Sequence, residues 1–256
     1  MLIAVNAGNS RVLLGGYEED GQVFSASIAT EPKLTRDDYA CKLQQVLLLY
    51  GVNVRRIHGG IVSSVVPSMV GVLEGAPRLL GIRDVIEVSS GVKTGLNIRS
   101  EQPRQVGSDR VAAAVAARAK GKLPCVAVTL GTATTFTALD GSGALVGSAI
   151  TAGVQLSLLA LREQAAQLPA VAIDAKDEGI LARNTVDAMR VGAVYGAASL
   201  VDGMVERFAE ALGETPYVVL TGELAPLVTP YLRIPFEYDE SLVLDGLHLI
   251  WKKNRG

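Results

Sequence analysis

The sequence has few of the residues on which several enzyme classes depend. Its 256 residues include two histidines, His58 and His248, and two cysteines, Cys41 and Cys125. The cysteines lie far apart and form no CxxC pair, so neither a disulfide framework nor a zinc site is indicated. Neither histidine lies near a GxSxG motif, which argues against a Ser-His-Asp hydrolase. A Walker A motif is also missing, so the chain is not a P-loop enzyme.

An excess of one charge and long apolar runs are missing as well. The formal net charge is -2 and 49% of the residues are hydrophobic, which gives no basic surface for nucleic acid and no acidic tail. No apolar stretch approaches the roughly 20 residues of a membrane-spanning helix, and no secretory signal opens the chain. We therefore expect a cytoplasmic protein that binds small molecules, and neither nucleic acid nor a membrane.

A short repeat is present in the chain. The segment IAVNAGNS at residues 3–10 aligns with VAVTLGTA at residues 126–133, which pairs Asn6 with Thr129. Each copy continues through a glycine-bearing turn into further apolar runs, as in the start of a β-meander. Two duplicated lobes with one glycine turn each would hold a phosphate chain in a cleft between them.

Strands and helices alternate between the two copies and after the second one, which predicts an α/β fold. The chain is long enough for two cores, and we place the lobes at residues 1–119 and 120–256. Apolar periodicity and cap residues predict helices at 35–50, 68–80, 111–119, 156–167, 185–212 and 241–251. Apolar runs between them predict strands at 56–63 and 84–89.

The turn GTATT at residues 131–135 combines a glycine with three threonines. Backbone amides freed by glycine, together with hydroxyl donors, suit phosphate oxygens. The alternative is an ordinary β-turn followed by a strand, where threonine is common. The paired turn NAGNS favours phosphate binding.

The segment VGSDR precedes an alanine-rich helix and offers two roles for Asp109. Ser108 and Asp109 suit a helix start, where a carboxylate complements the helix dipole. Alternatively, Asp109 is a general base that deprotonates a substrate hydroxyl while Arg110 binds an anionic group. Further along, Gly192 and Gly196 form a small-residue stripe for close helix packing, within the chain or across a dimer.

Six motifs follow one another along the chain, and together they resemble the motifs of the type III pantothenate kinases: NAGNS, TGL…P…VGSDR, GTATTF, GSAITAG, NTVDAMRVGAVYG and TGELA. The likeness runs from end to end. It implies an actin-like ATPase fold of the hexokinase and Hsp70 type, with two duplicated ribonuclease-H-like lobes. It also implies a homodimer that phosphorylates pantothenate with ATP and Mg²⁺, the first step of coenzyme A biosynthesis.

The resemblance assigns roles to matching positions. The ATP-binding positions are Asn6, Ala7, Gly8, Asn9, Ser10, Arg11, Val12, Leu13, Gly131, Thr132 and Gly222. The pantothenate-binding positions are Ser100, Gly107, Ser108, Asp109, Arg110 and Thr185, the last at the subunit interface. Asp109 matches the proton acceptor, Arg110 a ligand of the substrate carboxylate, and Thr129 the position that holds a monovalent cation, K⁺ or NH4⁺.

The chain departs from the family pattern at several of these positions. Asn6 and Thr129 stand where the family has Asp, and Ser100 stands where it usually has Tyr. Ser148 and Glu223 replace glycines, and Ala152 replaces proline. Loss of one charge about 4 Å from a metal forfeits on the order of 4 kcal/mol at an effective dielectric constant of ~20.

Three hypotheses follow from these departures. The chain is a pantothenate kinase with weak or conditional activity, a non-catalytic relative that binds nucleotide or a pantothenate-like ligand, or a kinase with a shifted substrate. Retention of Asp109 and Arg110 favours an active site, whereas the two lost carboxylates favour the regulator.

Overall fold

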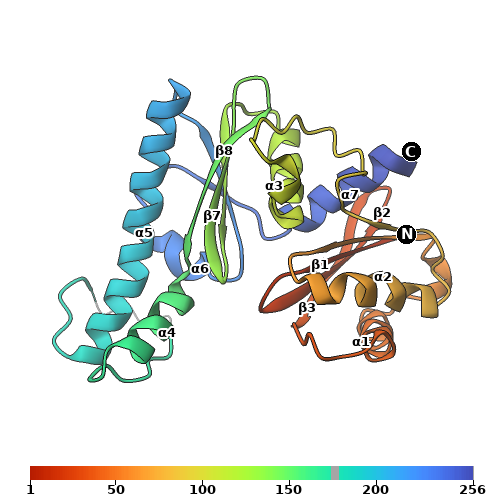
Figure 1. The fold of residues 1–256 in the computed structure, drawn as a ribbon, viewed down its shortest axis with the longest axis horizontal. Helices are drawn as coiled ribbons and strands as arrows, with labels where there is room; N and C mark the ends of the chain where they lie inside the picture. The colour runs from red at the N-terminus through yellow and green to blue at the C-terminus, as the bar shows by residue number, and fades with distance from the viewer. Residues whose placement is uncertain (174–178, 256) are drawn as a thin grey trace. The chain divides into compact units, whose positions relative to one another are not determined.

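A computed structural model describes residues 1–173 and 179–255 as two compact units (Figure 1). Unit 1 contains Met1–Lys120 together with the chain from Ser241 onward, and unit 2 contains Gly121–Glu240. The sequence-based division placed the last helix in the second lobe. In the structure this helix, α7 (Leu242–Arg255), belongs to unit 1 because its apolar face packs there.

Unit 1 is built on a five-stranded sheet in the order β3-β2-β1-β4-β5. Its first three strands form an antiparallel meander, and β4 and β5 continue the sheet in parallel with β1. The strands are β1 (Leu2–Ala7), β2 (Arg11–Glu18), β3 (Gly21–Ala29), β4 (Gly59–Ser64) and β5 (Val85–Glu87).

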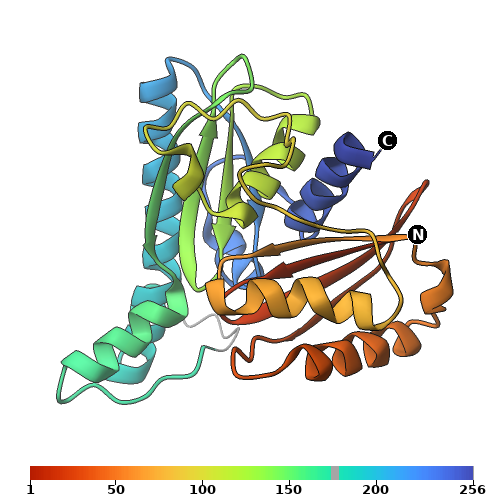
Figure 2. The ribbon, with the colours of Figure 1, turned by 45° about the vertical axis from the view of Figure 1, so that its right-hand side comes forward.

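Helices cover both faces of this sheet (Figure 2). One layer holds α1 (Arg36–Leu49) and α2 (Val70–Leu79), whose apolar side chains join β1 and β2 in one core. The other layer holds α3 (Ser108–Ala119) and α7, which pack closely against each other. Short 3₁₀ helices lie at Val54–Arg56, Pro67–Met69 and Pro103–Gln105.

Unit 2 repeats the arrangement of unit 1, with a sheet in the order β10-β9-β6-β7-β8. Again three strands form an antiparallel meander and two follow in parallel. The strands are β6 (Cys125–Leu130), β7 (Ala133–Leu139), β8 (Leu145–Ala152), β9 (Tyr217–Thr221) and β10 (Glu237–Tyr238). The repeat is therefore confirmed, because β1 and β6 are the central strands of two sheets with the same connectivity.

The helices of unit 2 are α4 (Val154–Gln164), α5 (Thr185–Leu212) and α6 (Ala225–Val228), followed by a 3₁₀ turn at Thr229–Tyr231. The side chain of Asn184 caps α5 by accepting from the backbone N–H of Asp187, and Gly213 ends it at φ 77°. The apolar face of α5 packs on β6 and β7, where Phe208 stacks on Phe136.

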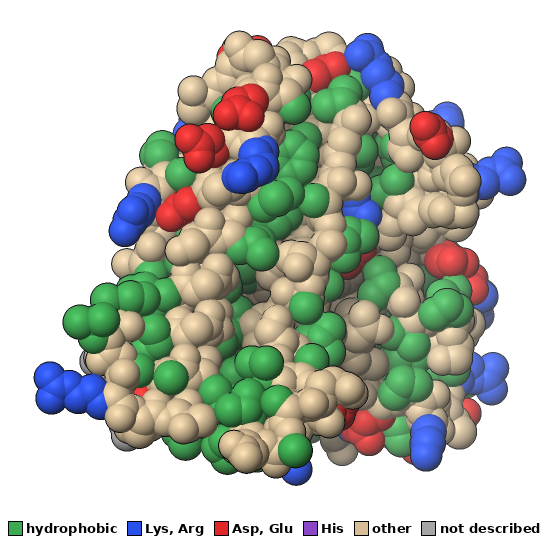
Figure 3. Space-filling view, turned by 60° about the vertical axis from the view of Figure 1, so that its left-hand side comes forward, with side chains coloured by type: hydrophobic (Ala, Val, Ile, Leu, Met, Phe, Trp, Pro, Cys, Tyr) green, Lys and Arg blue, Asp and Glu red, His purple; other side chains and the backbone are tan. Residues whose placement is uncertain are grey.

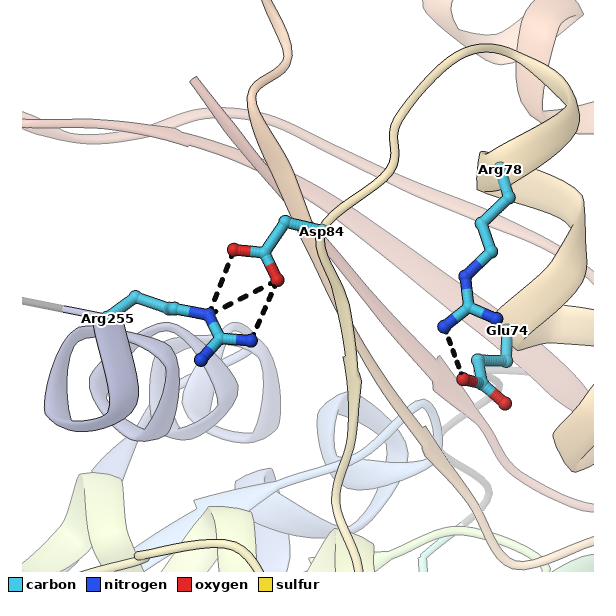
Figure 4. A network of polar contacts seen from close by, with 4 residues as sticks. All are labelled: Glu74, Arg78, Asp84 and Arg255. Atoms are coloured by element: carbon cyan, nitrogen blue, oxygen red, sulfur yellow. Dashed lines mark hydrogen bonds and ion pairs between the residues drawn. The ribbon is translucent and has the colours of Figure 1, made fainter.

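The C-terminal helix α7 is held in unit 1 by close contacts. A Cβ at Gly246 would lie 1.9 Å from the carbonyl oxygen of Ala112 in α3, so only glycine lets the two helices approach this closely. At its end, Arg255 Nε and Nη2 donate to Asp84 at 2.9 Å, while Arg78 pairs with Glu74 along α2 (Figure 4). In the described part of the chain, no helix is long and apolar enough to cross a membrane.

Candidate functional site

The β1–β2 turn of unit 1 is the first of the two predicted phosphate loops. The backbone N–H of Gly8 donates to the carbonyl oxygen of Arg11 at 2.9 Å, which closes the turn. Thr30, at the end of β3, holds the turn from the side: its hydroxyl donates to Gly8 O at 2.8 Å and its N–H donates to Ser10 O at 3.0 Å. Sequence reasoning did not single out Thr30.

Asn6 lies at the end of β1, between Leu13 of β2 and Ser63 of β4. Its side chain is 6% exposed, and its Oδ1 atom is buried without a hydrogen-bond partner among the described residues. An unsatisfied buried acceptor costs about 1–3 kcal/mol. The oxygen is therefore available to a ligand, and an amide oxygen suits Mg²⁺ or a water molecule bound to it.

The β6–β7 turn of unit 2 is the second predicted phosphate loop. Gly131 N–H donates to Ala133 O at 3.2 Å, and Gly153 N–H donates to Thr132 O at 3.0 Å. A Cβ at Gly153 would lie 2.1 Å from Gly131 O, and one at Gly222 would lie 2.3 Å from Leu130 O. Gly222 also has φ +109°, in the left-handed region. Glycine is therefore required at both positions for backbone to reach this turn.

Thr129 lies directly below that turn, in β6. Its sheet neighbours are Thr135 in β7 and Thr221 in β9, which places three hydroxyl-bearing residues side by side on one face. Within residues 1–173 and 179–255, no group of three or more His, Cys, Asp and Glu residues is arranged to hold a metal ion.

Helix α3 brings Asp109 and Arg110 together in unit 1. Gly107 is the N-cap and makes no side-chain cap hydrogen bond, Ser108 is the first residue of the helix, and the helix start expected at Ser108 and Asp109 is confirmed. Asp109 lies in the first turn, where its Oδ1 accepts from the backbone N–H of Arg110 at 2.7 Å. Burial raises the pKa of Asp109, and the hydrogen bond and charge of Arg110 oppose that rise. A carboxylate with a raised pKa is a better proton acceptor.

Two serines of β4 position the start of α3. Ser63 Oγ donates to Ser108 Oγ at 2.8 Å, and Ser108 Oγ donates to Ser64 O at 3.3 Å. These bonds join the end of the strand next to β1 to the first residue of α3. Sequence reasoning missed Ser63 and Ser64, although the serine pair that ends this buried strand is a signal that could have found them.

A cavity of about 660 Å³ opens beside this segment, lined only by residues of unit 1. Gly107 and Ser108 form part of its wall, between the ends of β4 and β5 and the chain that precedes α3. Ser100 is not among its lining residues; its Oγ accepts instead from the backbone N–H of Gln102 at 3.3 Å. Its role in substrate binding stays a prediction.

Thr185 is the first residue of α5 in unit 2. It lines a second, apolar cavity of about 320 Å³ together with residues of α4 and α5, among them Leu158 and Met189. Exposed apolar side chains surround this part of the surface, where Figure 3 shows hydrophobic groups gathered over α4 and α5. Those on α4 are Leu156, Leu159 and Leu161; Ile150 of β8 and, before α5, Ile180 and Leu181 are exposed as well.

Comparison with known proteins decides the family. The sequence profile of the type III pantothenate kinases matches residues 2–207. The chain belongs to the type III pantothenate kinase family. Relatives named type III pantothenate kinase include proteins of Geotalea daltonii, 38% identical, and of Pelobacter propionicus, 39% identical. Each alignment covers 100% of this chain and 99% or 100% of the relative.

Solved structures with this family's fold share little sequence with the chain. The ROK hexokinase of Thermus thermophilus has a TM-score of 0.51 at 15% identity and covers 99% of both chains. Component A of the (R)-2-hydroxyglutaryl-CoA dehydratase of Acidaminococcus fermentans has a TM-score of 0.56 at 15% identity, with the same coverage. The activator of a 2-hydroxyisocaproyl-CoA dehydratase of Clostridium difficile, solved with bound ADPNP, has a TM-score of 0.55 at 10% identity and covers 99% of this chain and 95% of that one. The fold is therefore the actin-like ATPase fold, as the resemblance implied.

Proposed function

We propose that this chain transfers the γ-phosphoryl group of ATP to pantothenate, the first step of coenzyme A biosynthesis. The observation that carries the proposal is the half-buried Asp109 carboxylate at the start of α3, which accepts from the Arg110 backbone N–H beside a cavity and whose pKa is raised by burial. Membership of the type III pantothenate kinase family supports the same activity.

The reaction needs one proton acceptor and one anion-binding group on the substrate side. The primary hydroxyl oxygen of pantothenate forms a bond to the γ-phosphorus, the bond from that phosphorus to the bridging oxygen of ADP breaks, and the hydroxyl proton passes to Asp109. The guanidinium of Arg110 binds the substrate carboxylate. The backbone N–H of Arg110 donates to Asp109 Oδ1 and keeps the Asp109 carboxylate in place. Gly107 and Ser108 complete the segment that contacts pantothenate.

The two glycine turns bind the phosphates of ATP. In unit 1 the proposed ATP-phosphate positions are Asn6 to Leu13, with the hydroxyl of Ser10 among the donors. In unit 2 they are Gly131 and Thr132, with Gly222 on the adenosine side. The unpartnered Oδ1 of Asn6 would hold Mg²⁺ through a bound water. Mg²⁺ neutralises charge on the transferred phosphoryl group. A monovalent cation, K⁺ or NH4⁺, would lie at Thr129 among the neighbouring hydroxyls.

A homodimer completes the proposal, with Thr185 contributing to substrate binding at the shared surface. The apolar cavity at Thr185 and the exposed leucines of α4 support it, because a monomer would leave this surface in water. Gly192 and Gly196 fit the same interface, since a Cβ at either would meet no described atom within 4 Å.

A cytoplasmic location accompanies this function. Cys41 is exposed and Cys125 is buried, and both are free thiols in the structure. Free thiols persist in reducing compartments.

A coupled assay of ADP formation tests the activity, with pantothenate present or omitted and with K⁺ or NH4⁺ present or omitted. We expect turnover that depends on pantothenate, ATP and Mg²⁺. Calorimetry with pantothenate and with ATP distinguishes the alternative: binding of both without turnover would show a non-catalytic ligand-binding relative. Absence of binding by either ligand would contradict both functions.

A further inference from the structure

Thr30 supports the first proposed phosphate turn from outside the set of ATP-binding positions. It directly follows β3 and is half-buried. Its hydroxyl donates to Gly8 O at 2.8 Å, and its backbone N–H donates to Ser10 O at 3.0 Å. One residue therefore fixes the direction of two carbonyl groups of the turn between β1 and β2.

A carbonyl group that is held in place also fixes the N–H group of the next residue. A trans peptide is planar, so its C=O and N–H groups point in opposite directions. The peptide between Gly8 and Asn9 is trans, and the Asn9 N–H therefore points opposite to the Gly8 carbonyl that Thr30 holds. Outward N–H groups of a glycine turn suit phosphate oxygens. Thr30 thus orients a donor of the proposed phosphate turn.

The duplicated unit contains an equivalent support point. Gly153 directly follows β8, the third strand of unit 2, as Thr30 directly follows β3, the third strand of unit 1. The N–H of Gly153 donates to Thr132 O, immediately before β7, and the N–H of Thr30 donates to Ser10 O, immediately before β2. The residue after the third strand therefore holds the proposed phosphate turn in both units.

The two support points differ in how they meet the carbonyl of the turn glycine. In unit 2 a Cβ at Gly153 would lie 2.1 Å from Gly131 O, so backbone packs on backbone there and only glycine fits. In unit 1 the matching carbonyl oxygen, Gly8 O, has room for a side chain and accepts from the Thr30 hydroxyl. The orientation of the first turn therefore depends on one hydroxyl, which a substitution removes without a change of backbone.

We infer that Thr30 is a positioning residue for the phosphates of ATP: its hydroxyl orients the peptide after Gly8 so that the Asn9 N–H binds a phosphate oxygen. This inference rests on the proposed function, because it requires the β1–β2 turn to bind ATP. Thr30 itself does not contact the nucleotide and takes no part in proton transfer. Loss of its hydroxyl should therefore weaken ATP binding without removing a catalytic group.

Substitutions at position 30 separate the hydroxyl from the shape of the side chain. Thr30→Val keeps the branched shape and removes the hydroxyl, whereas Thr30→Ser keeps the hydroxyl and serves as the rescue. Thr30→Ala also removes the hydroxyl and takes the place of Thr30→Val if that variant fails to fold. The matched control is Thr35→Val. Thr35 caps α1, where its Oγ accepts from the backbone N–H of Asp38 at 3.2 Å, so this variant loses a structural hydroxyl outside the turn.

Calorimetry with ATP and Mg²⁺ measures the effect directly. We expect Thr30→Val to weaken ATP binding between about twofold and about tenfold, the range that one hydrogen bond supplies. Thr30→Ser should retain most of the parent affinity. In steady-state kinetics, KM for ATP should rise in Thr30→Val while KM for pantothenate stays at the parent value. Thr35→Val should lower the melting temperature through loss of the cap and leave ATP affinity unchanged.

Failure of this inference is distinguishable from failure of the proposed function. If Thr30→Val binds ATP as tightly as the parent and pantothenate is phosphorylated, the inference is overturned and the proposed function stands. If Thr30→Ser or Thr35→Val loses as much ATP affinity as Thr30→Val, the hydroxyl of Thr30 has no specific role and the inference is again overturned. If ATP binding follows the expected pattern but pantothenate is not phosphorylated, the positioning role holds while the kinase function fails. A parent that binds no ATP contradicts both.

Discussion

The carboxylate of Asp109 lies over the α-carbon of Gly107, so close that a Cβ at position 107 would approach its Oδ1 to 2.7 Å. Absence of a side chain at the N-cap therefore leaves room for the Asp109 carboxylate. The Arg110 N–H fixes the same oxygen at 2.7 Å. The same carboxylate thus lies in the first turn of α3 and is the proton acceptor of the proposed reaction.

Asp109→Asn tests that assignment. Asparagine retains an oxygen that accepts from the Arg110 N–H but cannot take the hydroxyl proton, so we expect turnover to fall by about 10²–10⁴-fold. ATP affinity by calorimetry and the melting temperature should change little. A large loss of melting temperature with a proportionate loss of activity would instead assign Asp109 a structural role.

Acid stability should depend on His248 of α7. Burial, and then the charge of Lys252, lower the pKa of His248 to about 4, while its ring stacks on Tyr17 with centroids 4.4 Å apart. An unfolded histidine titrates at about 6.5. Between pH 6.5 and 4 the unfolded state thus binds a proton that the folded state does not, so the free energy of unfolding falls as the pH falls through this range.

His248→Phe keeps the ring and removes the proton-binding group. We expect urea unfolding of the parent to lose stability between pH 6.5 and 4, by less than about 3 kcal/mol because the ring is partly exposed. The variant should lose measurably less over the same range. Equal losses in the two proteins would assign the acid sensitivity to other groups.

Much of the local structure can be predicted from the sequence because its causes are local. Thr35 caps α1 in a capping box with Asp38, and Gly213 ends α5, at the positions that the cap rules predict. The repeat of NAGNS and TLGTA likewise predicts two β-meanders. Element boundaries that no cap residue marks differ from the prediction. The strand expected at residues 56–63 begins at Gly59, after a 3₁₀ turn at Val54–Arg56.

Features that depend on distant residues could not be predicted. The place of α7 is set by contacts such as that of Trp251 with Gly59, where a Cβ would lie 2.3 Å from the indole ring, and nothing in residues 241–256 specifies this partner. The cavity beside Gly107 depends on three separate segments. That Asn6 Oδ1 has no described partner is also a consequence of tertiary structure.

The oligomeric state can be tested at Gly196. A Cβ there meets no described atom within 4 Å, and glycine costs about 1 kcal/mol relative to alanine inside a helix. Gly196→Leu should therefore leave the monomer as stable as before, or more stable, while it weakens a dimer that uses this stripe. Light scattering at micromolar concentration measures the effect, with Ala211→Leu, at an exposed position of α5, as the control. A monomeric parent would contradict the dimer proposal.

Under the proposed function, we expect the activity of the chain to depend on Asn6. A carboxylate at this position would be buried at the end of β1, where the Asn6 Oδ1 has no hydrogen-bond partner among the described residues, and burying a charge is costly. Asn6→Asp should therefore lower the melting temperature when Mg²⁺ is omitted, and MgATP should restore part of the loss. The control Asn97→Asp adds the same charge at an exposed position outside the ATP-binding turn and should show neither effect.

Restoring both carboxylates should then raise turnover. We expect Asn6→Asp with Thr129→Asp to increase kcat more than either change alone, because under the proposed function both positions would act on one nucleotide and their effects need not be additive. The gain should appear in kcat rather than in ATP affinity, since the restored charges act most strongly on the cations as charge develops during transfer. Steady-state kinetics with Mg²⁺ and K⁺, beside calorimetry with ATP, measures both quantities. A double variant that folds without any increase would place the defect at Ser100, Ser148 or Glu223, whereas a parent that is already fast would show that an amide oxygen at position 6 suffices.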